Sequence, residues 1–168
     1  MLPRMAAPRW LDDRESRAWR GYLRLTWLLD AAIARDLQRD SGLSHADYYV
    51  LVQLSEAPGR RMRMSDLASG ILWSRSRVSH QTRRMEARGL VRREECASDA
   101  RGTFACLTRA GLRAIQEAAP SHVESIRRNL LDHLTPQQVD ALGDISATVV
   151  DWLAAALQPG DHDAEEGC

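Results

Sequence analysis

Apolar residues follow a helical repeat near both ends of the chain, and a different pattern separates these two parts. Residues 12–39 place apolar side chains every three or four positions, and further apolar residues widen the stripe. A helix with so broad an apolar surface is expected to contact its own core on one side and a partner on the other. Gly42 is expected to end this helix. Ser44, with Asp47 at the third helical position, predicts the capped start of a second helix.

The C-terminal part repeats the helical pattern in two stretches. Thr108 is expected to cap the first of them, and Pro120 interrupts its apolar spacing. Because proline cannot donate a helical hydrogen bond and crowds the preceding turn, we expect a kink or a break at this position. Residues 135–138 (TPQQ) form a helix-start signal. The final helix is expected to stop at residues 159–160 (PG), before a short acidic tail.

The middle of the chain, residues 60–113, begins with two short helices around a tight turn. A short amphipathic segment leads into the turn at residues 70–73, and Ser74 can cap the helix that follows. Gly89 suits the left-handed position just past the end of that helix. One face of the second helix is apolar, while the opposite face carries Ser, His and Arg; the apolar positions are Val78, Thr82 and Met85. This spacing predicts a helix-turn-helix.

Two short strands are expected directly after the second helix. Residues 90–95 and residues 103–107 have strand-like composition, and residues 97–102 between them are rich in turn formers. A hairpin that follows a helix-turn-helix forms a wing. The sequence therefore predicts a mainly α-helical protein with a small β-hairpin wing, organised as a winged helix-turn-helix with a helical dimerisation region.

The distribution of charge singles out the same segment. Residues 60–113 contain 13 Arg against five acids, a net charge of +8, whereas the rest of the chain has 10 Arg and 18 acids, a net charge of −8. The whole chain is neutral, with 23 basic and 23 acidic residues. Clustered positive charge on one compact module is typical of a surface that binds duplex DNA, because DNA phosphates favour grouped cations.

The outward face of the second helix has the chemistry needed in a DNA major groove. Arginine bonds guanine bidentately, serine reaches bases or phosphates, and a helix N-terminus favours a phosphate. In the wing, Arg101 is placed to enter a narrow A·T-rich minor groove, with Asp99 orienting it. The predicted DNA contacts are Ser74, Arg75, Ser76, Arg77, Ser79, His80, Arg83, Arg84, Asp99 and Arg101.

Plainer interpretations exist for these features. Most charged helix faces are simply solvated, and Asp99 with Arg101 can form an exposed turn ion pair worth at most about 1 kcal/mol. A basic module also suits a nucleoid-type protein that binds DNA without sequence choice, which a specificity ratio near unity would reveal. A third alternative is a protein-interaction module that keeps the fold without binding DNA.

The order of the motifs resembles the MarR family of bacterial transcriptional regulators. The succession SDLAS, WSRSRVSHQTRRMEARGLVRRE, SDARG and LTRAG carries the resemblance, which covers roughly residues 20–155 and includes LSHADYYVL upstream and LTPQQ downstream. One departure is Arg63, where the family usually has a capping Thr or Ser. The resemblance implies a homodimer that binds a palindromic site on double-stranded DNA, and we expect a repressor.

The expected organisation follows from this reading. Residues 1–42 are interpreted as an N-terminal tail and long dimerisation helix, and residues 43–113 as the winged helix-turn-helix domain. Residues 114–158 are interpreted as C-terminal dimerisation helices, and residues 159–168 as an acidic, disordered tail. The apolar surface of the terminal helices exceeds what the DNA-binding segment can cover, which favours a dimer; a monomer with a thick helical cap is the alternative.

Small-molecule control is the expected regulation. The sequence has five Trp and one Phe, and its Trp and Tyr residues gather in the helices beside the DNA-binding segment. Such side chains suit pocket lining because they combine apolar area with a polar group. The resemblance implies that aromatic or phenolic anions, antibiotics or metabolites bind there and release DNA. The predicted effector contacts are Trp19, Tyr22, Arg24, His45 and Tyr48; the alternative is that they are core aromatics and surface arginines.

Other function classes receive no support from the sequence. No apolar run reaches about 18 residues and the N-terminus lacks the apolar centre of a signal peptide, so we expect a cytoplasmic protein. The histidines lack zinc-site spacing, and no HExxH, CxxC, phosphate loop or nucleophile elbow occurs. We therefore expect no enzyme, catalytic residue, metal or cofactor. His122, near Glu124, is interpreted as part of a solvated helix start.

The three cysteines allow a second mode of regulation. Cys96 lies near Arg92 and Arg93 in sequence, which would lower its pKa if they were close in space, and this favours a redox-sensing regulator as the alternative hypothesis. The plainer interpretation is that Cys106 packs as a small hydrophobic residue and that Cys96 is incidental. Cys168 is the last residue of the sequence.

Overall fold

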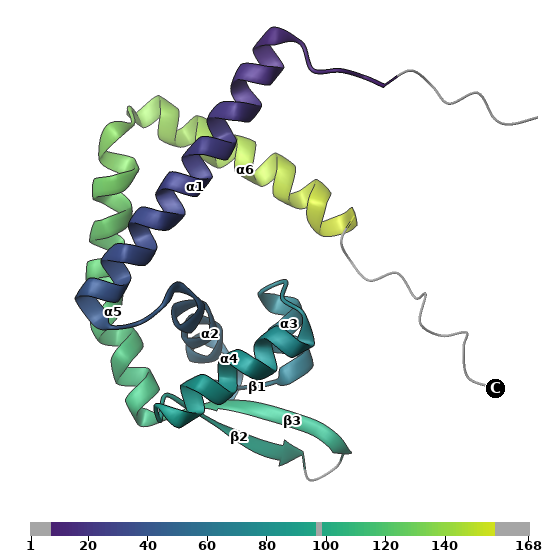
Figure 1. Cartoon of the computed structure of the whole chain (residues 1–168), viewed down its shortest axis with the longest axis vertical. Helices are drawn as coiled ribbons and strands as arrows, with labels where there is room; N and C mark the ends of the chain where they lie inside the picture. Colours follow the sequence, from purple (N-terminus) through teal and green to yellow (C-terminus); the bar gives the residue numbers. More distant parts are fainter. Residues whose placement is uncertain (1–7, 97–98, 157–168) are drawn as a thin grey trace, which may run out of the picture. The chain divides into compact units, whose positions relative to one another are not determined.

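The computed structural model describes residues 8–96 and 99–156, with the backbone alone at Cys96 and at residues 99–101. Two compact units make up the chain, Met1–Asn129 and Leu130–Cys168. Figure 1 shows the elements of the first unit, which are, in order, α1 (Asp13–Ser41), α2 (His45–Glu56), the 3₁₀ turn η1 (Pro58–Arg60), β1 (Arg61–Arg63), α3 (Met64–Gly70), α4 (Arg75–Ala87), β2 (Val91–Cys96), β3 (Asp99–Leu107) and α5 (Arg109–Asn129).

Helix α1 starts and ends on local signals. Asp12 and Glu15 form a reciprocal capping box, and Gly42 takes the left-handed conformation that ends the helix, with φ of 68°. In this long helix only Ile33, Asp36 and Leu37 are buried. The broad apolar surface expected from the sequence is therefore present, and most of it is exposed in the chain: Trp19, Tyr22, Leu25, Trp27 and Leu28.

The helix-turn-helix forms where the sequence predicts it. Ser74 accepts a hydrogen bond from the backbone N–H of Arg77 and caps α4, and Gly89 has φ of 71° just past its end. Arg63 occupies the cap position just before α3, and its side chain makes no capping bond to the helix. The turn between the helices contains Leu72 with φ of 53°, a conformation that is uncommon for a residue with a side chain.

A third strand joins the expected hairpin. β1 pairs antiparallel with β3, and β3 pairs antiparallel with β2, so the sheet has the order β1-β3-β2. The sequence analysis did not predict β1, because three residues are too few for an alternating pattern to be visible. β3 starts at Asp99, four residues before the predicted strand, so the wing has a shorter tip than expected.

The core of the first unit lies between α2, α3, α4, α5 and the sheet. It is built from buried aliphatic side chains such as Leu51, Leu54, Leu67 and Val78. Gly111, in the first turn of α5, is buried, and a Cβ at this position would collide with the backbone carbonyl of Leu90. The glycine therefore permits α5 to approach closely to Leu90, which lies just before β2.

A kink or a break was expected at Pro120; helix α5 is continuous through this residue, so it does not break there. Ser121 donates a hydrogen bond from its hydroxyl to the Ala118 carbonyl, three residues earlier, next to the proline. Burial on both sides of the proline, at Ala118 and Ser125, holds the helix in place. Tertiary packing thus outweighs the local preference of proline. Thr108 caps this helix as expected, by accepting a hydrogen bond from the Gly111 N–H.

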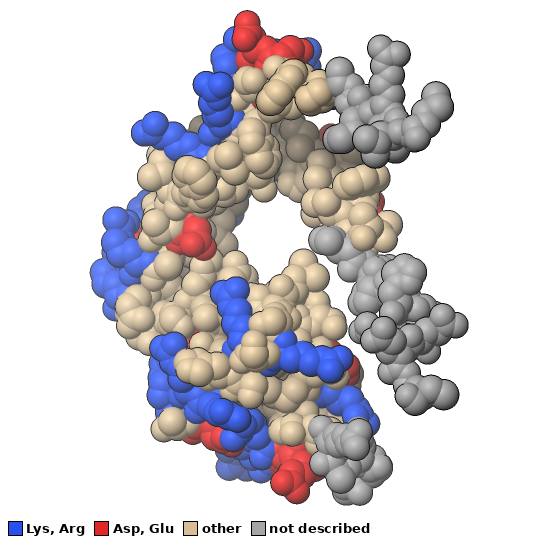
Figure 2. All heavy atoms as spheres, turned by 45° about the vertical axis from the view of Figure 1, so that its right-hand side comes forward, with Lys and Arg blue, Asp and Glu red and all other residues tan. Residues whose placement is uncertain are grey.

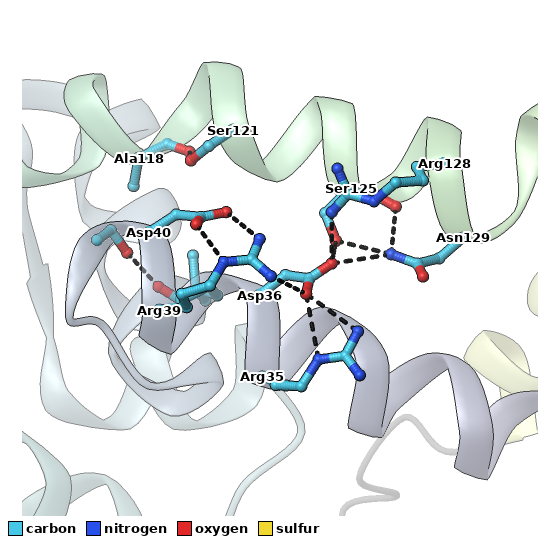
Figure 3. Close-up of polar contacts among 11 residues, drawn as sticks. Arg35, Asp36, Arg39, Asp40, Ala118, Ser121, Ser125, Arg128 and Asn129 are labelled. Atoms are coloured by element: carbon cyan, nitrogen blue, oxygen red, sulfur yellow. Dashed lines mark hydrogen bonds and ion pairs between the residues drawn. The ribbon is translucent and has the colours of Figure 1, made fainter.

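The contact of α1 with α5 is centred on the buried carboxylate of Asp36 (Figure 3). This carboxylate accepts hydrogen bonds from Ser125 Oγ at 2.9 Å, Arg128 Nη2 at 2.7 Å and Asn129 Nδ2 at 3.0 Å. The Arg128 guanidinium and the Ser125 hydroxyl hold the pKa of Asp36 well below its usual range. The C-terminal third of α1 is thus fixed to α5 by a satisfied polar network.

The second unit contains η2 (Leu131–His133) and α6 (Pro136–Ala156). Residues 135–138 start α6 as expected, because Thr135 and Gln138 cap each other reciprocally. None of the described residues of α6 is buried. In the part of the chain that the structure describes, no helix is long and apolar enough to cross a membrane. The predicted stop at residues 159–160 and the predicted acidic tail lie outside the described residues.

Candidate nucleic-acid interface

Helix α4 separates its two faces as the sequence predicts. Val78, Thr82 and Met85 are fully buried. The predicted DNA contacts on this helix lie on the opposite side, where all are exposed except Ser79, which is half-buried. Figure 2 shows that Arg side chains gather over the lower part of the molecule, where Figure 1 places α4 and the sheet. The structure therefore brings most of the predicted contacts onto one basic surface.

Side-chain contacts of the buried Asp47 set the position of α4. Asp47, at the start of α2, accepts a hydrogen bond from Gln81 Nε2 at 2.8 Å and forms an ion pair with Arg88 Nη1 at 2.7 Å. It also completes the capping box with Ser44. Although burial acts to raise the pKa of Asp47, the hydrogen bonds from Arg88 and Ser44 lower it overall. The carboxylate is thus held ionised, and it fixes α4 at its middle and at its C-terminal end.

Arg77 is pre-positioned by the turn. Its guanidinium carbon lies 3.9 Å from the centre of the Trp73 ring, in a cation–π contact. Stacking leaves the N–H groups at the edge of the guanidinium able to donate in the plane. Trp73 and Arg77 line a shallow hollow with Ser76, His80 and Arg84 on the outer side of α4. Trp73 thus lies beneath an arginine of the basic surface.

The wing is attached to α4 by an ion pair. Glu86 accepts hydrogen bonds from the backbone N–H of Arg93 at 2.9 Å and from its Nε at 2.8 Å. The Arg93 bonds lower the pKa of Glu86. This contact fixes β2 against α4. The side chains of Asp99 and Arg101, predicted to act at the tip of the wing, lie outside the described residues.

The predicted effector residues separate into two groups. Trp19 and Tyr22 stack on each other on the exposed part of α1, with ring centres 5.8 Å apart. His45 and Tyr48 lie at the start of α2, where His45 Nδ1 lies 2.9 Å from Asp30 Oδ1. Arg24 is exposed on α1, and no described contact joins it to either group.

His122 joins the second group, which the sequence analysis did not expect. The interpretation of His122 as part of a solvated helix start is wrong, because it lies in the middle of α5, and its Nδ1 is buried without a hydrogen-bond partner among the described residues. Its ring packs 4.1 Å from that of Tyr48, and His45 stacks on Tyr49. Burial lowers the pKa of His122. This cluster could not be predicted from the sequence, because its members come from α2 and α5, which are far apart along the chain.

Cys106 has the environment of a structural thiol. It is 5% exposed, and its Sγ donates to Glu94 Oε2 at 3.3 Å. Burial, followed by the contact with Glu94, raises its pKa, so the less reactive protonated form is favoured. The side chain of Cys96 and the whole of Cys168 lie outside the described residues. In the described ranges, no group of three or more His, Cys, Asp or Glu residues could hold a metal ion.

The helix-turn-helix, the antiparallel wing and the basic outer face of α4 define a winged helix-turn-helix protein. A model of the MarR family matches residues 41–102. The chain is 47% identical to AbsC, a MarR family transcriptional regulator from Streptomyces coelicolor, over 88% of this chain and 99% of AbsC, with a TM-score of 0.81. The chain therefore belongs to the MarR family of transcriptional regulators.

Two further solved structures are similar. Sco3205, a MarR family transcriptional regulator from Streptomyces coelicolor in complex with DNA, is 44% identical over 96% of each chain, with a TM-score of 0.81. BpsR from Bordetella bronchiseptica, whose DNA binding is regulated by 6-hydroxynicotinic acid, is 19% identical over 79% of this chain and 98% of BpsR, with a TM-score of 0.70. The latter likeness concerns the fold. A comparison with curated proteins gave no match.

Proposed function

We propose that this chain is a sequence-specific transcriptional repressor that binds a palindromic operator as a homodimer and is released by a small aromatic or phenolic ligand. The observation that carries the proposal is α4, which buries its apolar face and presents arginine, serine and histidine on an exposed one. A helix with this division enters the DNA major groove with its polar face toward the bases. The DNA complex of the relative Sco3205 supports this assignment.

Specificity is expected from exposed arginines in the first and last turns of α4. Each good bidentate contact of an arginine with guanine contributes about 1–3 kcal/mol of discrimination. Arg77 is held over Trp73 and is prepared for directional bonds, and Arg84 lines the same hollow. A nucleoid-type protein without sequence choice would not need an arginine held in a fixed orientation.

The homodimer is supported by the exposed apolar residues of two helices. α6 exposes Val139, Leu142, Ile145, Val149, Val150, Trp152 and Leu153, and α1 exposes a second set. Large exposed apolar surfaces mark interaction sites. A two-fold dimer would place two recognition helices about 34 Å apart, one turn of DNA, which is the reason for expecting a palindromic operator.

Control by a ligand is supported by the ring cluster of α2 and α5. The rings of Tyr48 and His122 face each other, and the buried Nδ1 of His122 is a polar group that a ligand could satisfy. BpsR shares the fold, and its DNA binding is regulated by an aromatic acid. Because His122 keeps a depressed pKa, its neutral ring would bind such a ligand by a hydrogen bond rather than by charge.

The proposal is tested by fluorescence anisotropy of the purified protein on DNA from upstream of its own gene and on scrambled DNA, across a salt series. Tight binding to the upstream fragment with a steep salt dependence is expected from a sequence-specific regulator. Equal affinity for both duplexes would favour the nucleoid-type alternative. Binding to neither duplex at low salt would favour a protein-interaction module. An operator complex that dissociates when simple phenolic acids are added would support the ligand.

A further inference from the structure

His122 lies on the inward side of α5, where a positive charge is costly. The buried residues Ile115, Ala118 and Ser125 follow this side of the helix, and His122 stands between the last two at helical spacing. Its Nδ1 is buried and has no hydrogen-bond partner among the described residues. A protonated imidazole carries an N–H on both nitrogens, so protonation would bury a charge and an unpaired donor. The packed arrangement therefore favours the neutral ring.

The side chains of α2 near His122 do not neutralise such a charge. The Tyr48 ring lies 4.1 Å from the His122 ring, and burial, followed by Glu56, raises the pKa of Tyr48, so the phenol stays uncharged. His45 would add a second positive charge when protonated. Asp30 of α1 lies 2.9 Å from His45 Nδ1, and it is placed to pair with that histidine.

The charged groups of α1 that lie toward α5 are already bonded. They contact one another and, through one buried carboxylate, residues 125, 128 and 129 (Figure 3); they are Arg35, Asp36, Arg39 and Asp40. Glu124, on α5 itself, is exposed. Because this network fixes α5 to α1, a charge on His122 is relieved by movement of α2 rather than of α5.

Helix α2 connects the His122 contact to α4. Tyr48 packs on His122 from the first turn of α2. The preceding residue, Asp47, bonds Gln81 and Arg88 of α4. A displacement of this turn away from α5 would therefore move the carboxylate that positions α4. Such a continuous set of contacts can carry a change at one site to another.

We propose that His122 is a proton-sensing residue, whose protonation separates the first turn of α2 from α5 and weakens the hold of α4 on DNA. The inference rests on the proposed function and deepens it, because it names acid as a second signal that acts through the ring cluster. A proton on the buried Nδ1 cannot be accommodated in the packed arrangement, whereas a displaced α2 would expose this nitrogen to water.

The pH range of this effect is set by the histidine. Burial, followed by His45, lowers the pKa of His122 from its ordinary value of 6.5. Its contribution to the packed arrangement is therefore fully present above about pH 6.5 and is lost as the pH falls through the folded value. Asp36 and Asp47 have lowered pKa values and stay ionised in this range. His80, exposed on α4, should act in the opposite direction, because its protonation adds positive charge toward DNA.

The test measures anisotropy of the full chain on its operator between about pH 7.5 and about pH 5.5 at constant ionic strength. The chains are wild type, His122→Phe and the control His133→Phe, which removes an exposed histidine. Phenylalanine keeps a ring against Tyr48 and takes up no proton. Wild type and the control should lose about 5- to 10-fold in affinity across this range, and His122→Phe should lose none.

A second readout measures the proton directly. Proton NMR follows the imidazole Cε1–H signals, and the signal of His122 is the one that disappears in His122→Phe and in His122→Gln. Its pKa should lie below the ordinary value in the free protein and should fall further when operator is bound, because DNA binding and proton release are reciprocal. A merely structural role of His122 would change the stability of the variant but leave the pKa equal in the free and bound protein.

The outcomes separate the two proposals. Wild-type operator binding that does not weaken with acid, or that weakens equally in His122→Phe, would overturn the proton-sensing role and leave the proposed function standing. A wild type that does not prefer its operator at pH 7.5 would overturn both. If neither His122 variant folds, the signal is assigned from the spectrum of the labelled wild type, and an equal pKa in free and bound protein would overturn the role. Acid sensitivity that depends on His122, with a lower pKa in the complex, establishes it.

Discussion

Helices α4 and α6 are both amphipathic, but they differ in the burial of their apolar sides. α4 buries Val78, Thr82 and Met85 against its own unit, while none of the described residues of α6 is buried. Trp152 and Ile145 on α6 are 70% and 63% exposed. The chain covers the apolar face of α4 by itself and leaves the apolar residues of α6 exposed. This difference is the reason for assigning DNA recognition to one helix and assembly to the other.

The same contrast runs along α1. Its C-terminal third is fixed to α5 by the network of Asp36, and its N-terminal half exposes Trp19, Tyr22 and Trp27. Polar contacts of the buried residues Asp36 and Asp47 thus hold the helices of the first unit together. Buried polar networks of this kind favour one arrangement over others when every member is satisfied. The apolar residues in the N-terminal half of α1 stay exposed in the chain.

The largest effect is expected on α6. Ile145→Glu places a charge in the middle of its apolar side and should convert the dimer to monomer. Operator affinity should then fall by roughly 100-fold or more, because avidity from two linked recognition helices is lost. Sedimentation equilibrium gives the mass, and anisotropy gives the affinity.

The matched control for this change is Ala147→Glu, which introduces the same side chain at an exposed position on the opposite side of α6. It should leave the dimer and the affinity intact. If Ile145→Glu remains dimeric, assembly does not depend on this side of α6. If it becomes monomeric and still binds the full operator as wild type does, the palindromic dimer model is wrong.

A smaller effect is expected at Asp47, whose contacts hold α4. Asp47→Ala leaves Gln81 without its buried partner and should reduce the free energy of unfolding by about 2 kcal/mol. The figure is modest because Arg88 is 44% exposed and water screens the ion pair. Urea unfolding measures the loss, and Asp140→Ala on exposed α6 is the control. Unchanged stability would remove Asp47 from the account of how α4 is positioned.

Acid should weaken the contacts of the two buried carboxylates, Asp36 and Asp47. The folded-state pKa values of Asp36 and Asp47 are lowered, so their contribution is fully present above the unfolded value of about 3.9 and is lost as the pH falls below it. The urea midpoint should therefore hold between about pH 7 and pH 5 as far as these carboxylates are concerned, and should drop below about pH 4. Asp36→Asn should show a shallower acid decline than wild type; an identical decline would exclude Asp36 as a source of acid sensitivity.

The smallest effect is expected at the wing. Arg101→Ala should weaken operator binding by about 3- to 10-fold and relax the preference for A·T pairs that flank the site. Competition anisotropy with operators that differ only in these flanks measures both changes. Unchanged affinity and unchanged flank preference would remove the tip of the wing from the interface.

Much of the fold could be predicted from local signals. Ser44, Ser74, Gly42 and Gly89 mark helix ends by side-chain or backbone chemistry that acts within a few residues. The mainly helical fold with a winged helix-turn-helix was predicted on this basis and is confirmed. β1 was missed because its three residues gain their structure from pairing with β3, which lies about 40 residues further along the chain.

The contacts that position the site were less predictable. Gln81 and Asp47 are 34 residues apart, and Asp36 and Ser125 are 89 residues apart, so no periodicity connects them. The position of His122 beside Tyr48 arises in the same way. Pro120 was expected to disturb α5, and tertiary packing on both sides kept the helix continuous. Sequence patterns gave the outward face of α4 correctly because only its own periodicity was needed.

The central claim is that α4 recognises DNA while α6 joins two copies, and the mass of the protein–DNA complex tests it most directly. Sedimentation velocity of the protein with a palindromic operator duplex, and with a duplex that contains one half-site, gives the number of chains bound. The account predicts two chains on the full operator at concentrations where the half-site duplex is almost unbound. One chain on the full operator, or equal binding to both duplexes, would contradict it.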